Sequence, residues 1–281
     1  MPTDTPGSAQ PPWASTRQFL DLHPLDDECR RWRLELTSRN TGGMGSLFGG
    51  AGLAAGLECL SAHTGRPAVW GTTQFVSITQ QPVTIDLEVE VSAAGRKVSQ
   101  GRVIARVDDR EVFSFMGAVG ARPDLGRGAA PVMPDAAAPE DCELMVRDED
   151  SPDALHHFVE VRPARGMFGF TEFGEASGDE RTLMWCKVID CPLDAASLAV
   201  LADYMPSALG NAYARQTHCS SLDNTIRLCD PVPADSDGWV LLDNRMEYAA
   251  NGFAVGSCLM WGRDGTLLAT ASQSMAVSGF A

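Results

Sequence analysis

The chain has 281 residues, a formal net charge of −15 at pH 7 and 44% hydrophobic residues. This length suits one large domain or two of ordinary size, and the hydrophobic fraction is normal for a protein with a buried core. Nucleic-acid affinity comes mainly from Lys and Arg, so the acidic charge excludes nucleic acid as the main partner. A small anionic ligand is not excluded, since a few local cations would suffice to bind it.

Neither the first residues of the chain nor its cysteines suggest secretion. Residues 1–12 are polar, acidic and rich in proline, whereas a signal peptide is basic and then apolar. No uninterrupted apolar run reaches the ~18 residues of a membrane span. The eight cysteines form no Cys-x-x-Cys pair and have no His at zinc-site spacing, which favours small buried side chains in a reducing compartment. We therefore expect a cytoplasmic protein without a membrane span, metal or cofactor.

The first half of the chain predicts a helix among strands. A strand over residues 30–37 precedes an apolar helix over 47–63, a strand over 72–78 and three strand-like runs that end near residue 119. The helix carries no charge before Glu58, which favours a helix enclosed by a sheet. Gly49 and Gly50 at its start fit either close packing and turn geometry, or a helix N-terminus that presents N–H groups to a carbonyl or phosphate.

A proline-rich segment separates the two halves. Residues 122–155 contain five prolines among alanines and acidic residues, which is typical of an extended linker. We divide the chain into an N-terminal tail (1–27), a first repeat (28–121), this linker (122–155) and a second repeat (156–281).

The second half repeats the order of the first. A strand over residues 183–189 precedes a helix over 195–209, a strand over 220–228 and three strand-like runs that end near residue 277. The last two runs of each half flank a turn, at Asp108-Asp109 and at Asp264-Gly265. Such a repeat predicts two similar units that share one core.

Several motifs along residues 28–281 resemble the acyl-CoA thioesterase II family, whose members are double hot-dog enzymes. The motifs are Leu47-Phe48-Gly49-Gly50, Glu160-Val161-Arg162-Pro163, Ser221-Leu222-Asp223-Asn224-Thr225, Trp239-Val240-Leu241-Leu242-Asp243, Asn251-Gly252-Phe253 and Asp264-Gly265-Thr266-Leu267-Leu268-Ala269 through Gln273. None is specific by itself, and the weight lies in their order and spacing. The resemblance implies an α+β double hot-dog fold, in which each repeat wraps a twisted antiparallel sheet around a central helix.

The resemblance also implies a site in the second half, with Asp203, Ser221 and Gln273 as its catalytic group. The family usually has threonine where Ser221 stands, so the hydroxyl is kept and the methyl that restricts its rotamer is missing. Asp203 lies in an apolar stretch, where burial would raise its pKa and make it a better base. We expect these residues to activate a water that hydrolyses acyl-CoA to free acid and coenzyme A, as part of lipid metabolism.

Substrate contacts are expected from Gly49, Gly50 and His218. Backbone N–H groups near the two glycines would face the thioester oxygen. His218 lies three residues before Ser221, where its side chain could enter the pocket. Duplicated hot-dog chains commonly associate through sheet edges, so we also expect a homo-oligomer.

Other interpretations of the same residues remain open. A hot-dog hydratase of enoyl thioesters would pair a histidine with an acid, and His218 is the candidate for it. A non-catalytic acyl-CoA binder is a second alternative, because a fold does not fix a function. Taken singly, Asp203, Ser221 and Gln273 could each be an ordinary exposed polar residue. A serine hydrolase is disfavoured, because the chain has no Gly-x-Ser-x-Gly motif.

Overall fold

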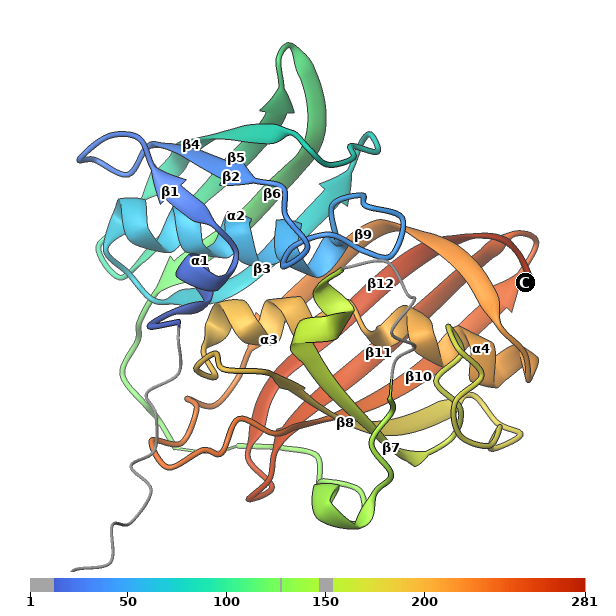
Figure 1. The fold of residues 1–281 in the computed structure, drawn as a ribbon. Coiled ribbons are helices and arrows are strands. Elements are labelled where there is room, and N and C mark those ends of the chain that lie inside the picture. Colours follow the sequence, from blue (N-terminus) through green and yellow to red (C-terminus); the bar gives the residue numbers. More distant parts are fainter. Residues whose placement is uncertain (1–12, 127, 147–153, 281) are drawn as a thin grey trace, which may run out of the picture.

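The computed structural model describes residues 13–126, 128–146 and 154–280, and within them twelve strands form one antiparallel sheet (Figure 1). The strand order is β1-β2-β4-β5-β6-β3-β9-β12-β11-β10-β8-β7. The described part of the chain contains no helix that is long and apolar enough to cross a lipid bilayer.

The elements of the first half follow the predicted order. They are α1 (Thr16–Phe19), β1 (Leu22–Pro24), β2 (Arg31–Glu35), α2 (Gly49–Thr64), β3 (Ala68–Phe75), β4 (Thr84–Ala94), β5 (Val98–Val107) and β6 (Arg110–Gly120). The predicted tail, residues 1–27, contributes α1 and the edge strand β1, which pairs with β2. Residues 1–12 of that tail lie outside the described residues, and the domain division as a whole stays a prediction.

The second half repeats these elements after the linker. They are η1 (Pro139–Asp141), η2 (Leu155–Phe158), β7 (Val159–Arg165), β8 (Arg181–Val188), α3 (Ala195–Ala202), η3 (Met205–Ser207), α4 (Ala208–Tyr213), β9 (Thr217–Leu228), β10 (Val240–Ala250), β11 (Phe253–Gly262) and β12 (Leu267–Phe280). Residues 127 and 147–153 of the predicted linker lie outside the described residues.

The two halves meet at strands β3 and β9 in the middle of the sheet. Their pairing runs from Trp70 opposite Arg227 to Gln74 opposite Asp223, and its centre is the pair of Thr72 and Thr225. Read outwards from this junction, the strand order of one half is the same as that of the other. The sheet therefore has an approximate twofold axis near the Thr72–Thr225 pair, as a duplicated chain requires.

Helix α2 is buried along most of its length because small and apolar residues occupy all of its faces. Residues from Gly50 to Leu57 are buried, and Leu53, Leu57 and Leu60 fill the space between the helix and the sheet. Burying each leucine stabilises the fold by about 1.5–3 kcal/mol. The helix ends at Gly65, whose φ of 65° is the left-handed conformation that glycine adopts at a helix C-cap.

The second central helix was predicted as one continuous helix over residues 195–209, but the structure divides this segment. Helix α3 ends at Ala202, and the chain continues as η3 and α4. Pro206 explains the break, since proline lacks an N–H and its ring clashes with the carbonyl four residues earlier, here that of Ala202. Asp203 is therefore the C-cap residue of α3 and lies at a helix end.

Candidate active site

Asp203 is the centre of a buried hydrogen-bond network between the two halves. Asp203 is only 4% exposed to solvent. Oδ1 accepts hydrogen bonds from Gln273 Nε2 (2.7 Å), Asn224 Nδ2 (3.2 Å) and Ser221 Oγ (3.3 Å). Oδ2 accepts one from the backbone N–H of Gly50 (2.8 Å). The structure thus brings four of the six predicted site residues, Asp203, Ser221, Gln273 and Gly50, into one cluster.

A β-bulge in β9 places both Ser221 and Asn224 against Asp203. In a regular strand, residues three apart face opposite sides of the sheet. Here Asp223 lies opposite Ser274 and Ser221 lies opposite Met275, so that Leu222 is the extra residue of the bulge. The bulge reverses the alternation, and both polar side chains reach the carboxylate. Asn224 was not predicted as a site residue, because a bulge carries no clear sequence signal.

Ser221 and Gln273 also contact each other. Gln273 Nε2 donates to Ser221 Oγ across 2.6 Å, and Ser221 Oγ in turn donates to Asp203. Both N–H groups of the Gln273 amide are used in this way. The Ser221 oxygen keeps one lone pair for another donor, such as a water molecule.

Burial has the largest effect on the pKa of Asp203. Loss of contact with water raises the pKa of its carboxyl to about 6, although the hydrogen bonds from Gly50, Gln273, Ser221 and Asn224 each lower it. Desolvation disfavours the charged form, whereas donors stabilise it. The carboxylate is therefore ionised at neutral pH and is still a stronger base than a surface aspartate.

Gly49 and Gly50 allow the start of α2 to approach Asp203 closely. A Cβ on Gly49 would lie 2.8 Å from Asp203 Oδ2 and 2.9 Å from Phe75 Cζ, and one on Gly50 would overlap the carbonyl oxygen of Val200. The Gly50 N–H is already donated to Asp203, while no described residue accepts the N–H of Gly49. Gly49 lines the adjoining pocket, and its N–H is one of the donors that the first turn of a helix leaves without an intrahelical acceptor.

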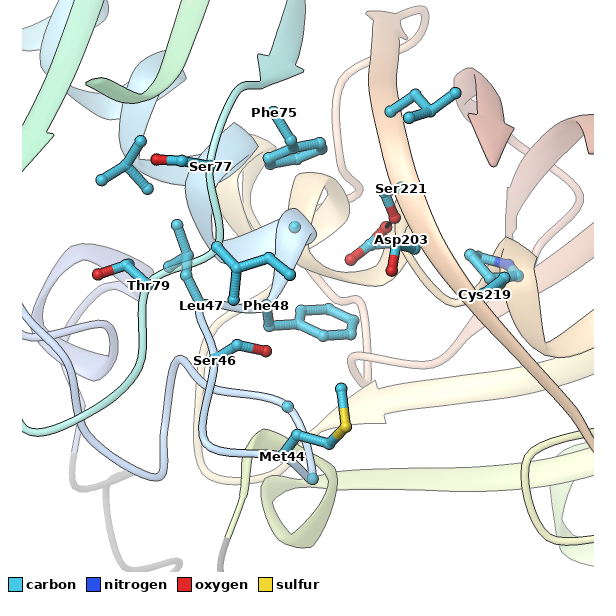
Figure 2. A pocket seen from close by; sticks show the side chains of 18 of the residues that line it. Met44, Ser46, Leu47, Phe48, Phe75, Ser77, Thr79, Asp203, Cys219 and Ser221 are labelled. Carbon is cyan, nitrogen blue, oxygen red and sulfur yellow. Dashed lines mark hydrogen bonds between the residues drawn. The ribbon is translucent and has the colours of Figure 1, made fainter. Parts of the chain in front are cut away.

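A pocket of about 400 Å³ adjoins Asp203 and is lined by residues of both halves. Figure 2 shows Asp203 and Ser221 on one side of it, near Phe75 and Phe48. The exposed side chains of Met44 and Ile78, 79% and 71% accessible, mark its mouth. None of the described lining residues is Lys or Arg, and the mostly apolar lining includes several hydroxyl groups, His156 and the carboxylate of Asp203.

An aromatic cluster packs beside the carboxylate. His156 Nδ1 lies 3.0 Å from the Tyr204 hydroxyl, and the rings of Phe48, His156 and Tyr204 contact one another with centroids 5.5–5.8 Å apart. Phe48 is the N-cap of α2, and Tyr204 follows Asp203 directly. The cluster therefore joins the two chain segments that carry Gly50 and Asp203. His156 was not predicted as a site residue, yet it lines the pocket.

His218 does not join the site. It lies near the start of β9 with an exposed side chain, and it is not among the residues that line the pocket. Strand alternation explains this, because Ser221, Cys219 and Thr217 face inward before the bulge and His218 faces the other way. The predicted substrate contact of His218 is therefore not supported by this geometry.

The first half has no counterpart of the polar cluster at the twofold-related position. The strand pairings place Ala68, Gly71 and Gly117 where Ser221, Asn224 and Gln273 stand in the second half. The hairpin turns give the same correspondence, since Gly117 comes nine residues after Asp108 and Gln273 comes nine residues after Asp264.

Phe115 fills this first-half position. A Cβ on Gly117 would lie 2.7 Å from its ring, and one on Gly56 or Gly71 would overlap the side chain. The ring is fully buried. Among the described residues, no group of three or more His, Cys, Asp or Glu is arranged to hold a metal ion.

Comparison with known proteins identifies the family. Residues 139–277 match the family model described as acyl-CoA thioesterase C-terminal domain. The solved structure of a candidate thioesterase from Novosphingobium aromaticivorans is 34% identical, with a TM-score of 0.78, over 92% of this chain and 99% of the other. The chain belongs to the acyl-CoA thioesterase family. The predicted class of enzyme, a thioester hydrolase similar to acyl-CoA thioesterase II, is thereby confirmed.

More distantly related solved structures have the same architecture as this thioesterase. A conserved protein with a hot-dog fold from Alicyclobacillus acidocaldarius is 22% identical, with a TM-score of 0.82, over 94% of this chain and 99% of its own. Acyl-CoA thioesterase II TesB2 from Mycobacterium marinum is 19% identical, with a TM-score of 0.72, over 95% and 99%. These confirm the predicted α+β double hot-dog fold. A comparison with curated proteins found no match.

Proposed function

We propose that this thioesterase hydrolyses acyl-CoA to free acid and coenzyme A at Asp203, by direct attack of a water molecule. The observation that carries the proposal is the buried carboxylate, held by donors from both halves and placed at the wall of a mostly apolar pocket. An acyl chain suits such a pocket, since small-molecule sites are mostly apolar with a few polar groups.

Two oxygen atoms of the network, Asp203 Oδ2 and Ser221 Oγ, can each accept one more hydrogen bond, and together they bind the attacking water. Oδ2 of Asp203 accepts only the Gly50 N–H from the described residues, so it has room for a hydrogen from water. The second hydrogen of that water goes to the remaining lone pair of Ser221 Oγ. Gln273 orients Ser221 by its hydrogen bond to the same oxygen. The water is thereby oriented by groups that do not themselves react.

The reaction then needs one proton relay and one oxyanion donor. Asp203 removes a proton as the water oxygen bonds to the thioester carbon, and the N–H of Gly49 stabilises the negative oxygen together with the α2 dipole. When the tetrahedral intermediate collapses, the C–S bond breaks and the proton on Asp203 passes to the leaving sulfur. Carboxylic acid and coenzyme A result. Gly50 was expected to share the oxyanion role, but its N–H is bound to Asp203.

Release of free thiol from a panel of acyl-CoA substrates, from short to long chains, tests this function. Saturable release at a rate above buffer hydrolysis is the expected result. Saturable acyl-CoA binding without release would identify a non-catalytic binder instead. Hydration of an enoyl-CoA without thiol release would identify a hydratase, for which the exposed position of His218 offers no support.

We also propose that the protein forms a homo-oligomer and acts in cytoplasmic lipid metabolism. In the described part of the chain, the sheet ends at β1 and β7, and an edge strand has unpaired N–H and C=O groups that another copy can pair with. Sedimentation velocity at several protein concentrations tests the assembly. A single species with the 30.0 kDa mass of the chain at every concentration would contradict it.

A further inference from the structure

Three buried polar atoms without a partner lie in one row beneath Asp203. They are Thr73 Oγ1, Asn224 Oδ1 and Gln273 Oε1, and they are half of the six such side-chain atoms found among the described residues. Their residues are at most 1% exposed. A polar atom buried without a hydrogen bond destabilises a fold, so native proteins leave few of them and usually for a reason.

The strand register places these three side chains next to one another. Thr73 of β3 lies opposite Asn224 of β9, which lies opposite Gln273 of β12. Directly paired residues have their side chains on the same face, with Cβ atoms about 4.5–5.5 Å apart. Phe115 lies opposite Thr73 at one end of the row and Gly256 opposite Gln273 at the other. Neither of these side chains can supply a hydrogen bond.

The two amides have their orientation fixed by Asp203. Asn224 and Gln273 each donate an N–H to Oδ1 of the carboxylate. Turning either amide over would bring its oxygen against the negatively charged oxygen. The amide oxygens are therefore directed away from Asp203, and both are acceptors that need a donor.

We propose that one buried water molecule joins this row, donating a hydrogen to Asn224 Oδ1 and one to Gln273 Oε1 while accepting the hydroxyl hydrogen of Thr73. This assignment satisfies all three atoms with the two hydrogens of one water and the single hydrogen of one hydroxyl. Buried waters typically make about three hydrogen bonds to otherwise unsatisfied polar groups. Thr73, which belongs to the first half, thereby becomes a positioning residue for a site in the second half.

The consequence for catalysis rests on the proposed role of Asp203. With their oxygens held, Asn224 and Gln273 keep their N–H groups on the carboxylate. Without the Thr73 hydroxyl, the water loses its donor and the amides gain freedom to turn. Fewer donors would reach Asp203, so its pKa would rise and less of it would be the reactive base.

Substitution of Thr73 by valine tests this role, because valine keeps the shape and removes the hydroxyl. We expect Thr73→Val to lower kcat about five- to tenfold with little change in KM, and to move the acidic limb of the kcat profile to higher pH. Thr73→Ser should restore both. The matched control is Thr72→Val, one residue away on the opposite face, where it removes the 2.7 Å contact with Thr225 Oγ1.

Two kinetic results would contradict the proposed role of Thr73. An unchanged kcat and pH profile in Thr73→Val, or an equal loss in Thr72→Val, would overturn the positioning role. A crystal structure of the unaltered protein that resolves ordered waters tests the water directly, whether or not the protein proves to be a thioesterase. Density within hydrogen-bond distance of the three atoms supports the proposal, and a dry, tightly closed row contradicts it.

Discussion

The backbone N–H of Gly50 donates a hydrogen bond to Asp203 Oδ2 across 2.8 Å, and this bond joins the helix of the first half to the catalytic carboxylate proposed in the second. The contact exists because α2 begins with two glycines and α3 ends at Ala202. Neither half alone could form the site. The two repeats have thus become one functional unit, although only one of them carries the polar residues.

Gly49→Ala should damage activity more than stability. Its Cβ would lie 2.8 Å from Asp203 Oδ2 and 2.9 Å from Phe75 Cζ, so the carboxylate has to move. We expect kcat to fall at least tenfold and the free energy of unfolding to drop by about 1–3 kcal/mol, as for other overpacked sites. Gly128→Ala is the control, since nothing lies within 4 Å of a Cβ there and the residue does not line the pocket. Equal activity in both variants would count against close contact at Gly49.

Activity should fall on the acid side of neutrality. Burial raises the pKa of Asp203 to about 6, and the proposed mechanism needs its ionised form. Below that pH the carboxyl of the free enzyme is protonated and cannot accept a proton, so kcat/KM should decline about tenfold for each further pH unit. Measurement of kcat/KM from pH 4.5 to 8 checks this. A profile that stays flat below pH 5 would mean that another group is the base.

Ser221→Ala should impair hydrolysis without abolishing it. The hydroxyl positions the attacking water but forms no bond to the acyl group, so its removal should cost about 10- to 100-fold in kcat, similar to other lost positioning hydrogen bonds. Ser221→Thr keeps the hydroxyl and should retain activity. Stopped reactions analysed by mass spectrometry should show the unaltered protein mass. An acyl adduct on Ser221 would instead reveal a covalent mechanism.

Phe115→Ala should destabilise the protein by about 3–5 kcal/mol, because the ring fills the first-half position between Gly56, Gly71 and Gly117. Met116→Ala is the control, since that neighbouring side chain faces solvent and should change stability by less than about 0.5 kcal/mol. Urea unfolding of both variants measures the difference. Equal stability of the two would show that Phe115 does not fill a packed position.

Much of the architecture was predictable because it depends on patterns that repeat along the chain. The order of strands and helices came from hydrophobic periodicity and turn residues, and the grouping of Asp203, Ser221 and Gln273 came from the family resemblance. Both kinds of signal can be read along the chain without knowing which segments pack together.

The remaining features depend on geometry that such patterns do not encode. The bulge at Leu222 decides that Asn224 faces Asp203 together with Ser221. His156 reaches the pocket only because η2 packs against Phe48 and Tyr204. By contrast, the helix end at Asp203 could have been predicted from the sequence, because Pro206 disfavours a continuous helix there.

The most direct test of the account compares acyl-CoA hydrolysis by the unaltered protein, Asp203→Asn and Asp223→Asn. Asp223 is the matched control, because it lies on the same strand as Ser221 and its carboxylate accepts from Ser274 N, outside the Asp203 network. With folding verified by circular dichroism, Asp203→Asn should lose at least about 100-fold in kcat while Asp223→Asn keeps its rate. Full activity in Asp203→Asn would contradict the proposal that this carboxylate activates the water.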